Sequence, residues 1–497
     1  MENDAQAGSR KWEFEAVAQK SIKAVMALGL RQTFTLGFRL AAGVLLARLL
    51  SPSEFGVFGI VTFGLAFLTV FADVGLGASL IRQSAEPTEN EYRTMFGAQQ
   101  LLVSAAAITL WLASARIALA YRLPPHDAIV FQLVAVSFFV SSFQTIPSIR
   151  LERHLEFNKL ALMETVQSFT YNAVTVIAAY AGLGALSFGL GLLVRSVSGA
   201  ALINWLSPWK IRWRLDLRLV RSHLRFGLPY QGISVVSLIK DSITPLFVGL
   251  LVGTAGVGYI TWAIMVAGYP AISLMVFQRI YLPAFSRMQN QRDKLVHFVE
   301  RALLGTNAFT APLAVLTLVL VRPVTVLIFG AKWLVALPLF YLFWFSGILG
   351  PSSTPVIGLL NALGFSAVTF SFALTWMIAT WVLGAPLIWL MGTLGFGVAL
   401  IGVELTALPM FRLAQRRLPF RIFSVIWPVW AVASLMGAGI YVVQHFLPVA
   451  NLLMLATYGA LGLFMYMVSL RLLYPALAGK IWGLVKGTVW HLASRQS

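Results

Sequence analysis

The 497-residue sequence contains no cysteine, and charged residues make up only 11% of it. Without cysteine there are no disulfides, thiol redox centres or thiolate metal sites. A soluble protein carries about 25% charged residues, so a surface this poor in charge cannot face water over most of its area. Hydrophobic residues make up 59% of the chain, and the mean hydropathy is +0.81. The composition therefore predicts a polytopic membrane protein and excludes a series of soluble domains.

Several chemical motifs are also absent from the sequence. The six histidines are scattered without metal-ligand spacing, and no Gly-rich phosphate loop or convergent Ser/His/Asp set is present. No loop is large enough to hold a soluble catalytic domain. We therefore expect no enzyme activity, no metal and no ATP-driven transport. The first 24 residues mix acidic and basic side chains, which is not the pattern of a signal peptide.

Apolar stretches long enough to cross a bilayer dominate the chain. A membrane-spanning helix needs about 20 mostly apolar residues, so we expect an all-α protein with about fourteen transmembrane helices. The predicted spans are residues 25–47, 55–80, 95–119, 128–149, 160–181, 186–206, 226–251, 256–278, 302–321, 337–360, 365–389, 394–411, 423–446 and 450–473.

Basic residues alternate between the predicted loops and so predict the topology. With a cytosolic N-terminus, 28 of the 37 Lys and Arg residues fall on the cytosolic side and four fall in outside loops. Such a bias follows the positive-inside rule and also explains the net charge of +19 without nucleic acid. We therefore expect both termini to be cytosolic and the protein to lie in the cell inner membrane.

A weak internal repeat relates the two halves at an offset of 202 residues. The stretch LARLLSPSEFGVF (46–58) aligns with VGLLVGTAGVGYI (248–260), which places Gly56 on Gly258. Repeats of this kind are common in transporters, with the substrate site between the halves. The predicted organisation is a cytosolic segment (1–24), a first six-helix lobe (25–206), an interfacial linker (207–225), a second six-helix lobe (226–411), two further helices (423–473) and a cytosolic tail (474–497).

The linker alternates aromatic and basic residues. We expect it to lie along the membrane interface with Trp209 and Trp213 at headgroup level. A role in gripping phosphate is the alternative.

Nine charged residues lie within the predicted spans, where a charge costs several kcal/mol unless it has a partner, a water-filled cavity or a short reach to the interface. Arg116 and Glu164 lie near helix ends, so we expect them to reach the interface. For the deeper charges the alternatives are structural ion pairs and a water-filled cavity, of which we favour the cavity. The deeper residues are Arg31, Arg39, Arg195, Lys240, Asp241 and Glu404, and the ninth charge, Asp73, lies in the predicted span 55–80.

The sign and position of these charges suggest roles. Arginines dominate the first half, and arginine suits phosphate because its planar fork donates two parallel hydrogen bonds. The repeat places Asp241 at the position of Arg39, so we hypothesise that the two form a latch between the halves. Interior prolines are concentrated in the second half, and either simple kinking or a moving half with broken helices would account for them.

Two strings near the N-terminus carry a family resemblance. LARLLSPSEFGVFGIV (46–61) and FADVGLGASLIRQ (71–83) resemble the N-terminal signature of polysaccharide-exporting flippases of the Wzx type, in the multidrug/oligosaccharidyl-lipid/polysaccharide exporter superfamily. IRLERHLEFNKLA (149–161), YLPAFSRMQ (281–289) and FGAKWLVALP (329–338) resemble the same family. The similarity runs from about residue 20 to residue 345.

The resemblance implies a two-lobed flippase that moves an undecaprenyl-diphosphate-linked oligosaccharide for exopolysaccharide, O-antigen, lipopolysaccharide or capsule export. It implies alternating access around a cationic cavity, with no bound cofactor and an H⁺ or Na⁺ gradient as the energy source. On this reading Arg31, Arg39, Arg195 and Lys240 bind the substrate, and Asp73, Asp241 or Glu404 serve as coupling or counter-ion groups. The expected partners are the lipid-linked oligosaccharide, membrane lipids, and a polysaccharide polymerase with its chain-length regulator.

Three alternatives remain. A flippase for the lipid II-type peptidoglycan precursor has the same fold and helix number, but the strings at 46–83 match the polysaccharide branch better. A drug or cation antiporter of the superfamily should carry acids instead of arginines in its first half. A polysaccharide polymerase or ligase needs a sizeable outside loop, which this chain lacks.

Overall fold

The computed structural model describes residues 35–73, 75–83, 85–274, 281, 284–479 and 481. Every regular element within these ranges is a helix, which confirms the all-α prediction. Twelve helices in this part of the chain are long and apolar enough to cross a membrane. The two further predicted spans are 25–47, described only from residue 35, and 160–181, which forms the helix α7 (Phe157–Tyr180). The number fourteen therefore stays a prediction.

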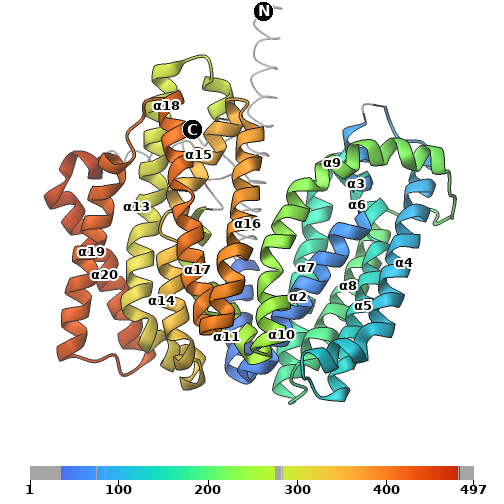
Figure 1. The fold of residues 1–497 in the computed structure, drawn as a ribbon, viewed down its shortest axis with the longest axis horizontal. Helices are drawn as coiled ribbons and strands as arrows, with labels where there is room; N and C mark the ends of the chain where they lie inside the picture. The colour runs from blue at the N-terminus through green and yellow to red at the C-terminus, as the bar shows by residue number, and fades with distance from the viewer. Residues whose placement is uncertain are drawn as a thin grey trace, which may run out of the picture.

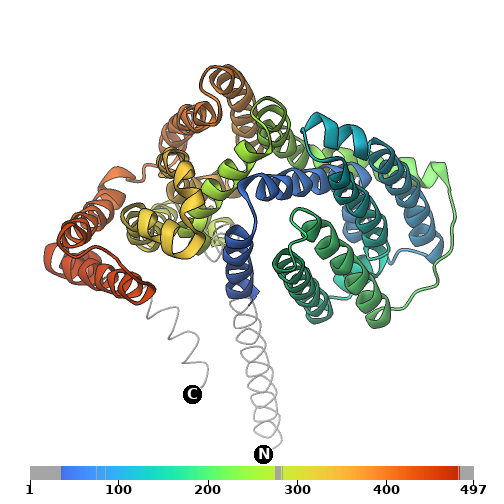
Figure 2. The same cartoon turned by 90° about the horizontal axis from the view of Figure 1, so that it is seen from below.

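The helices form two lobes, with a helix pair at the far edge of the second lobe (Figures 1 and 2). A helix over residues 35–49 lies between the lobes in Figure 2. The first lobe continues with α2 (Pro52–Asp73), α3 (Leu76–Arg82), α4 (Glu89–Ala120), η1 (Pro125–Asp127), α5 (Ala128–Ser142), α6 (Thr145–Arg153), α7 and α8 (Leu186–Leu206).

The second lobe begins with α9 (Leu217–Asp241). This helix first crosses the end of the first lobe and then turns along the second (Figure 1). The predicted boundary at residue 225 therefore falls inside α9. The lobe continues with η2 (Ile243–Val248), α10 (Gly249–Leu251), α11 (Thr254–Gly268), η3 (Tyr269–Ser273), α13 (Arg292–Val324), η4 (Thr325–Phe329), η5 (Ala331–Ala336), α14 (Leu337–Ser346), α15 (Gly350–Ala362), α16 (Ser366–Met391), α17 (Thr393–Leu405) and α18 (Leu408–Arg417).

The last helix pair is α19 (Phe423–Phe446) and α20 (Leu452–Leu473), and both helices pack against α13. One continuous hydrophobic core runs from the first lobe through the second into this pair. It includes Val57 of α2, Ile260 of α11, Trp333 of η5 and Met436 of α19, each at most 1% exposed. The shared core joins the lobes at one face of the protein.

The predicted repeat is visible where α2 crosses α11. A Cβ atom on Gly56 would lie 1.8 Å from the carbonyl oxygen of Thr254, and one on Gly258 would lie 1.9 Å from that of Pro52. A shift of 202 residues turns the first contact into the second, so the two helices are related by an approximate two-fold axis. Only glycine permits this approach of the two backbones.

Prolines in the second half have two different outcomes. Pro245 lies in the π-helical turn η2, which interrupts the predicted span 226–251, and Pro270 lies in the 3₁₀ turn η3. Pro312, Pro386 and Pro428 lie inside the continuous helices α13, α16 and α19. Broken helices are therefore found at the start of the second lobe, next to Lys240 and Asp241.

Candidate functional site

The structure brings two of the predicted substrate-binding arginines together in the first lobe. Phe38 stacks on Phe169 of α7 with ring centroids 5.1 Å apart, which holds the helix over residues 35–49 against α7. Arg39 follows Phe38 in the chain and lies within electrostatic reach of Arg195 on α8. Both residues are exposed, and protein atoms including Tyr171 surround part of the Arg195 side chain.

One acidic residue belongs to the same cluster. Glu164 of α7 is exposed and within electrostatic reach of Arg195. The prediction treated Glu164 only as a residue near a helix end, because sequence spacing does not show that α7 and α8 face each other. The cluster of Arg39, Glu164 and Arg195 therefore carries two positive charges and one negative charge, and still attracts an anion.

The helices around this cluster are joined by polar contacts. Gln167 of α7 donates to the side-chain oxygen of Gln144 at 2.6 Å, and Gln144 donates to the carbonyl of Ser196 on α8 at 3.0 Å. The hydroxyls of Thr170 and Ser198 lie 3.0 Å apart. These side chains explain why α7 is less apolar than the other predicted spans. They join α7 and α8, the two helices that carry Glu164 and Arg195.

A third predicted cation, Lys240, is neutralised by its neighbour. Lys240 and Asp241, at the end of α9, form an ion pair of 2.6 Å, with side chains 39% and 62% exposed. The hypothesised latch between Asp241 and Arg39 is absent between these two described residues, because the acid is paired within its own helix. The pair precedes the π-helical turn η2, and such turns are frequent at functional sites.

The structure says less about the other predicted charges, Glu404, Asp73 and Arg31. Glu404 of α17 is half-buried, and the structure gives its carboxylate no hydrogen bond or ion pair within the described residues. Asp73 ends α2, and its side chain lies outside the described part of the chain. Arg31 also lies outside the described residues. Within those ranges no group of three or more His, Asp or Glu residues is placed to hold a metal.

A second functional feature is the contact that closes one face between the lobes. Besides the paired glycines, the hydroxyls of Ser53 and Thr254 lie 2.6 Å apart across this contact. Trp333 of η5 is fully buried, and its ring lies against Phe55 of α2 at a centroid distance of 5.3 Å and against Trp262 of α11 at 5.4 Å. We call this set of contacts the lobe junction.

Two side chains of η5 clamp the end of the helix over residues 35–49 within the lobe junction. The Trp333 indole donates to the carbonyl of Ala47 at 2.8 Å, and the Lys332 ammonium donates to those of Arg48 and Leu50 at 2.8 and 2.5 Å. A cation at a helix C-terminus also complements the helix dipole. A further hydrogen bond runs from the first lobe to the second, because the Tyr121 hydroxyl donates to the carbonyl of Pro245 at 3.1 Å. The clamp joins two family-like strings, LARLLSPSEFGVFGIV and FGAKWLVALP.

At the other face, Arg153 joins two more of these strings. Its guanidinium donates to the carbonyls of Leu80, Gln83 and Ala85 at 2.7, 2.8 and 3.0 Å, and it reaches the carboxylate of Glu86 at 3.3 Å. The side chain is only 10% exposed. Arg153 therefore fixes the turn after α3, and sequence reasoning missed this role because the residue looks like an ordinary cytosolic charge.

The first part of α9 is fastened to this same face. His223 lies 2.8 Å from the hydroxyl of Ser79 on α3, and a Cβ atom on Gly75 would lie 2.4 Å from the backbone oxygen of Gly227. Burial lowers the pKa of His223 below its usual value, and the nearby Glu91 carboxylate offsets part of that effect. The neutral imidazole is therefore the form that suits this contact.

The linker before α9 is only partly interfacial in character. Trp209 packs edge-on against Phe96 of α4 at 5.1 Å, inside the protein. Trp213 also approaches Phe96 at 6.3 Å but is 62% exposed. Trp213 thus suits the predicted headgroup position, whereas Trp209 is a packing residue of the first lobe.

The two-lobed helical fold and the twelve membrane-length apolar helices within the described residues define a multi-pass membrane protein. A family model described as "Polysaccharide biosynthesis protein" matches residues 45–338, and the chain belongs to this family. The resemblance seen in the sequence is thereby confirmed.

The chain is similar to two curated proteins over most of its length. It is 24% identical to the "Succinoglycan biosynthesis transport protein ExoT" of Rhizobium meliloti (strain 1021), over 71% of each chain. It is also 24% identical to the "Lipopolysaccharide biosynthesis protein WzxC" of Escherichia coli (strain K12), over 72% of this chain and 73% of that one.

Solved structures show the same fold. The lipid II flippase MurJ, in an inward closed conformation, superposes with a TM-score of 0.75 at 15% identity, covering 91% of this chain and 99% of the other. An inward-facing multidrug transporter of the MATE family superposes with a TM-score of 0.52 at 15% identity, covering 78% of this chain and 94% of the other.

Proposed function

We propose that this protein moves an undecaprenyl-diphosphate-linked oligosaccharide across the cell inner membrane for polysaccharide export. The observation that carries the proposal is that Arg39 and Arg195 lie within electrostatic reach of each other, where polar contacts join α7 and α8, in a chain of the polysaccharide biosynthesis family. Two arginines on facing helices suit a diphosphate, because each guanidinium offers a planar fork of donors.

The other charges take different roles in this proposal. Lys240 binds substrate only after it releases Asp241, so the pair at the end of α9 responds to substrate or to an ion. Glu404, half-buried and without an ion pair among the described residues, is our candidate for a proton or Na⁺ coupling group. Arg31 and Asp73 remain candidates from the sequence.

The lobe junction suits the closed side of an alternating-access cycle. With cytosolic termini, as the distribution of Lys and Arg favours, the junction lies at the outer face, so the cationic cluster is reached from the cytosol. The substrate enters there, the junction opens, and the lipid leaves in the outer leaflet. A polymerase and a chain-length regulator then use the exported oligosaccharide.

The test is a leaflet-accessibility assay with purified protein in liposomes containing a fluorescent undecaprenyl-diphosphate oligosaccharide. We expect the wild type to flip the lipid, and Arg39→Gln and Arg195→Gln to lower the rate at least tenfold. Arg116→Gln, an exposed arginine of α4, is the matched control and keeps the wild-type rate.

Each alternative gives a different result in this assay. Equal rates for all variants would refute the site but keep the function. Movement of a lipid II analogue alone would favour the peptidoglycan-precursor flippase, and a product of new mass would show a polymerase or ligase. If no lipid-linked sugar moves under either an H⁺ or a Na⁺ gradient, the proposed function is wrong.

A further inference from the structure

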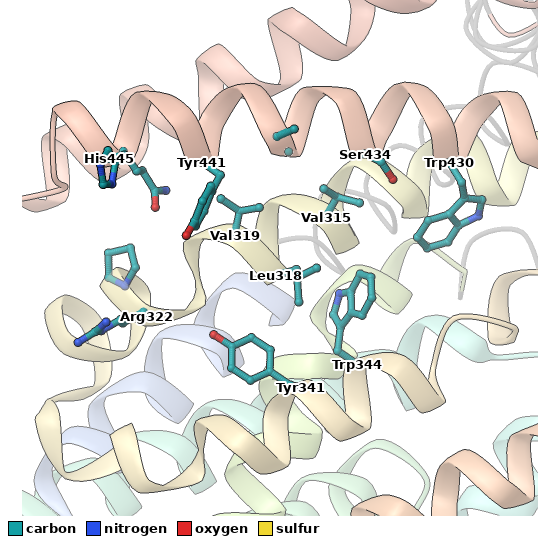
Figure 3. A pocket seen from close by; sticks show the side chains of 14 residues that line it. Val315, Leu318, Val319, Arg322, Tyr341, Trp344, Trp430, Ser434, Tyr441 and His445 are labelled. Atoms are coloured by element: carbon teal, nitrogen blue, oxygen red, sulfur yellow. The ribbon is translucent and has the colours of Figure 1, made fainter.

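A pocket of about 720 Å³ lies in the second lobe between α13, α14 and α19, on different helices from the arginine cluster (Figure 3). Its two ends differ in chemistry. Figure 3 shows Arg322 and His445 at one end and Trp344 and Trp430 at the other. The transport proposal above does not use this pocket.

The inner end of the pocket is apolar although it contains two tryptophans. The Trp344 indole donates to the carbonyl of Ala314 at 2.8 Å, and the Trp430 indole donates to the side-chain oxygen of Asn307 at 2.9 Å. Both N–H groups are therefore already used by the protein. The rings meet edge to face with centroids 6.5 Å apart and present carbon surface to the pocket.

The outer end offers hydrogen-bond donors and positive charge. Arg322 is exposed and forms no ion pair within the described residues, and no carboxylate lines the pocket. The side-chain nitrogen of Gln444 is buried without a hydrogen-bond partner. A buried amide donor without an acceptor destabilises the folded protein, and a ligand that accepts its hydrogen bond removes this penalty. An anionic group beside Arg322, Gln444 and His445 would supply that acceptor.

The dimensions of the pocket suit a lipid. The stretch of α19 from Trp430 to His445 rises about 22 Å, and one leaflet of a bilayer is about half of the ~30 Å hydrocarbon core. Along this stretch Ser434 and Ala438 are small and exposed, so they leave the groove open beside α13. The pocket is therefore long enough for a lipid acyl chain that spans one leaflet, with an anionic headgroup at the outer end.

We propose that this pocket binds an anionic phospholipid of the membrane, with its phosphate at Arg322, Gln444 and His445 and one acyl chain along α19 toward Trp430 and Trp344. The charge at one end and the dry aromatic end together select an amphiphile over a free phosphate. The bound lipid fills the space between α19 and the second lobe, so it stabilises the attachment of the C-terminal helix pair.

Two variants remove different parts of the pocket, and each has a matched control. Arg322→Gln removes the charge at the head, and Arg122→Gln removes an exposed arginine of the first lobe. Ala438→Phe fills the groove, and Ala456→Phe adds the same bulk at an exposed alanine of α20 that does not line the pocket. Because Ala438→Phe keeps every charge, it tests the site even if the arginine variant folds poorly.

The experiment adds phosphatidylglycerol, phosphatidylcholine or undecaprenyl phosphate to delipidated full-length protein. Retained lipid is measured by native mass spectrometry, and Tm by thermal unfolding. We expect one retained phosphatidylglycerol and a raised Tm, since a ligand that binds only the folded state stabilises it. Arg322→Gln and Ala438→Phe should weaken retention about tenfold, and the two controls should not.

Three results would overturn the proposal. These are equal retention of the two phospholipids, equal retention by Ala438→Phe and Ala456→Phe, and retention of undecaprenyl phosphate in place of phosphatidylglycerol. None of them depends on whether the protein flips an oligosaccharide, so this inference and the transport proposal fail separately.

Discussion

Gly56→Ala tests whether the close approach of α2 and α11 keeps the lobe junction closed. The new Cβ atom would lie 1.8 Å from the Thr254 carbonyl oxygen, and a backbone atom cannot move aside as a flexible side chain does. Overpacking costs typically 1–3 kcal/mol. A loss of about 2 kcal/mol shifts the equilibrium roughly thirtyfold. An open state populated at about 1% would then rise to about a fifth of the molecules.

The natural lack of cysteine makes this shift measurable. In a Ser53→Cys background the chain has a single thiol, which lies in the lobe junction opposite Thr254. We expect Gly56→Ala to raise its labelling by a membrane-impermeant maleimide about twentyfold. A single thiol at Ser352, which is 1% exposed in the second lobe, reports unfolding and should stay unlabelled.

Gly64→Ala is the matched control on the same helix. A Cβ atom there would meet nothing within 4 Å, and alanine favours a helix over glycine by about 1 kcal/mol. This variant should therefore label at the wild-type rate. Equal labelling of the Gly56→Ala and Gly64→Ala variants would refute the reasoning, because it would show that the glycine contact does not hold the junction closed.

Three further predictions concern the stability of the two faces. Arg153→Ala leaves the part-buried carbonyls of Leu80 and Gln83 without this donor and should cost about 1–3 kcal/mol, seen as a lower Tm. Lys159→Ala breaks only an exposed pair with Glu156, worth under about 1 kcal/mol. Because the pKa of His223 is lowered in the folded protein, its contact with Ser79 contributes fully above pH ~6.5 and weakens as pH falls below that value. A plot of Tm against pH should show this loss in the wild type and not in His223→Gln. Lys332→Met removes two hydrogen bonds from a charged donor, and one such bond is worth about 1.5–3 kcal/mol. The variant should therefore speed maleimide labelling of the thiol at Ser53→Cys in the lobe junction at least tenfold. Unchanged labelling would contradict the clamp.

Much of the fold followed from composition and spacing. Apolar runs predicted the helices, and the weak repeat predicted that Gly56 and Gly258 occupy equivalent positions. The sequence did not show that these glycines contact each other, because an alignment of two halves does not place their symmetry axis. The aromatic packing of Trp333 was likewise hidden, since one tryptophan in an apolar string has no distinctive pattern.

The candidate site was predicted less completely. Arg39 and Arg195 were identified because charge is rare at depth, and packing of the helix over residues 35–49 on α7 brought them together. Glu164 required knowledge of which helices are neighbours. The latch of Arg39 with Asp241 was not found, because the adjacent Lys240 is a nearer partner for the acid.

The central claim is that lipid moves only when the lobe junction opens. Ser53→Cys with Thr254→Cys places two thiols where the hydroxyls are now 2.6 Å apart, in a chain with no other cysteine. Flipping of the fluorescent undecaprenyl-diphosphate oligosaccharide should stop when this pair is oxidised and return when it is reduced. Flipping at the same rate in the fully oxidised protein would contradict the account.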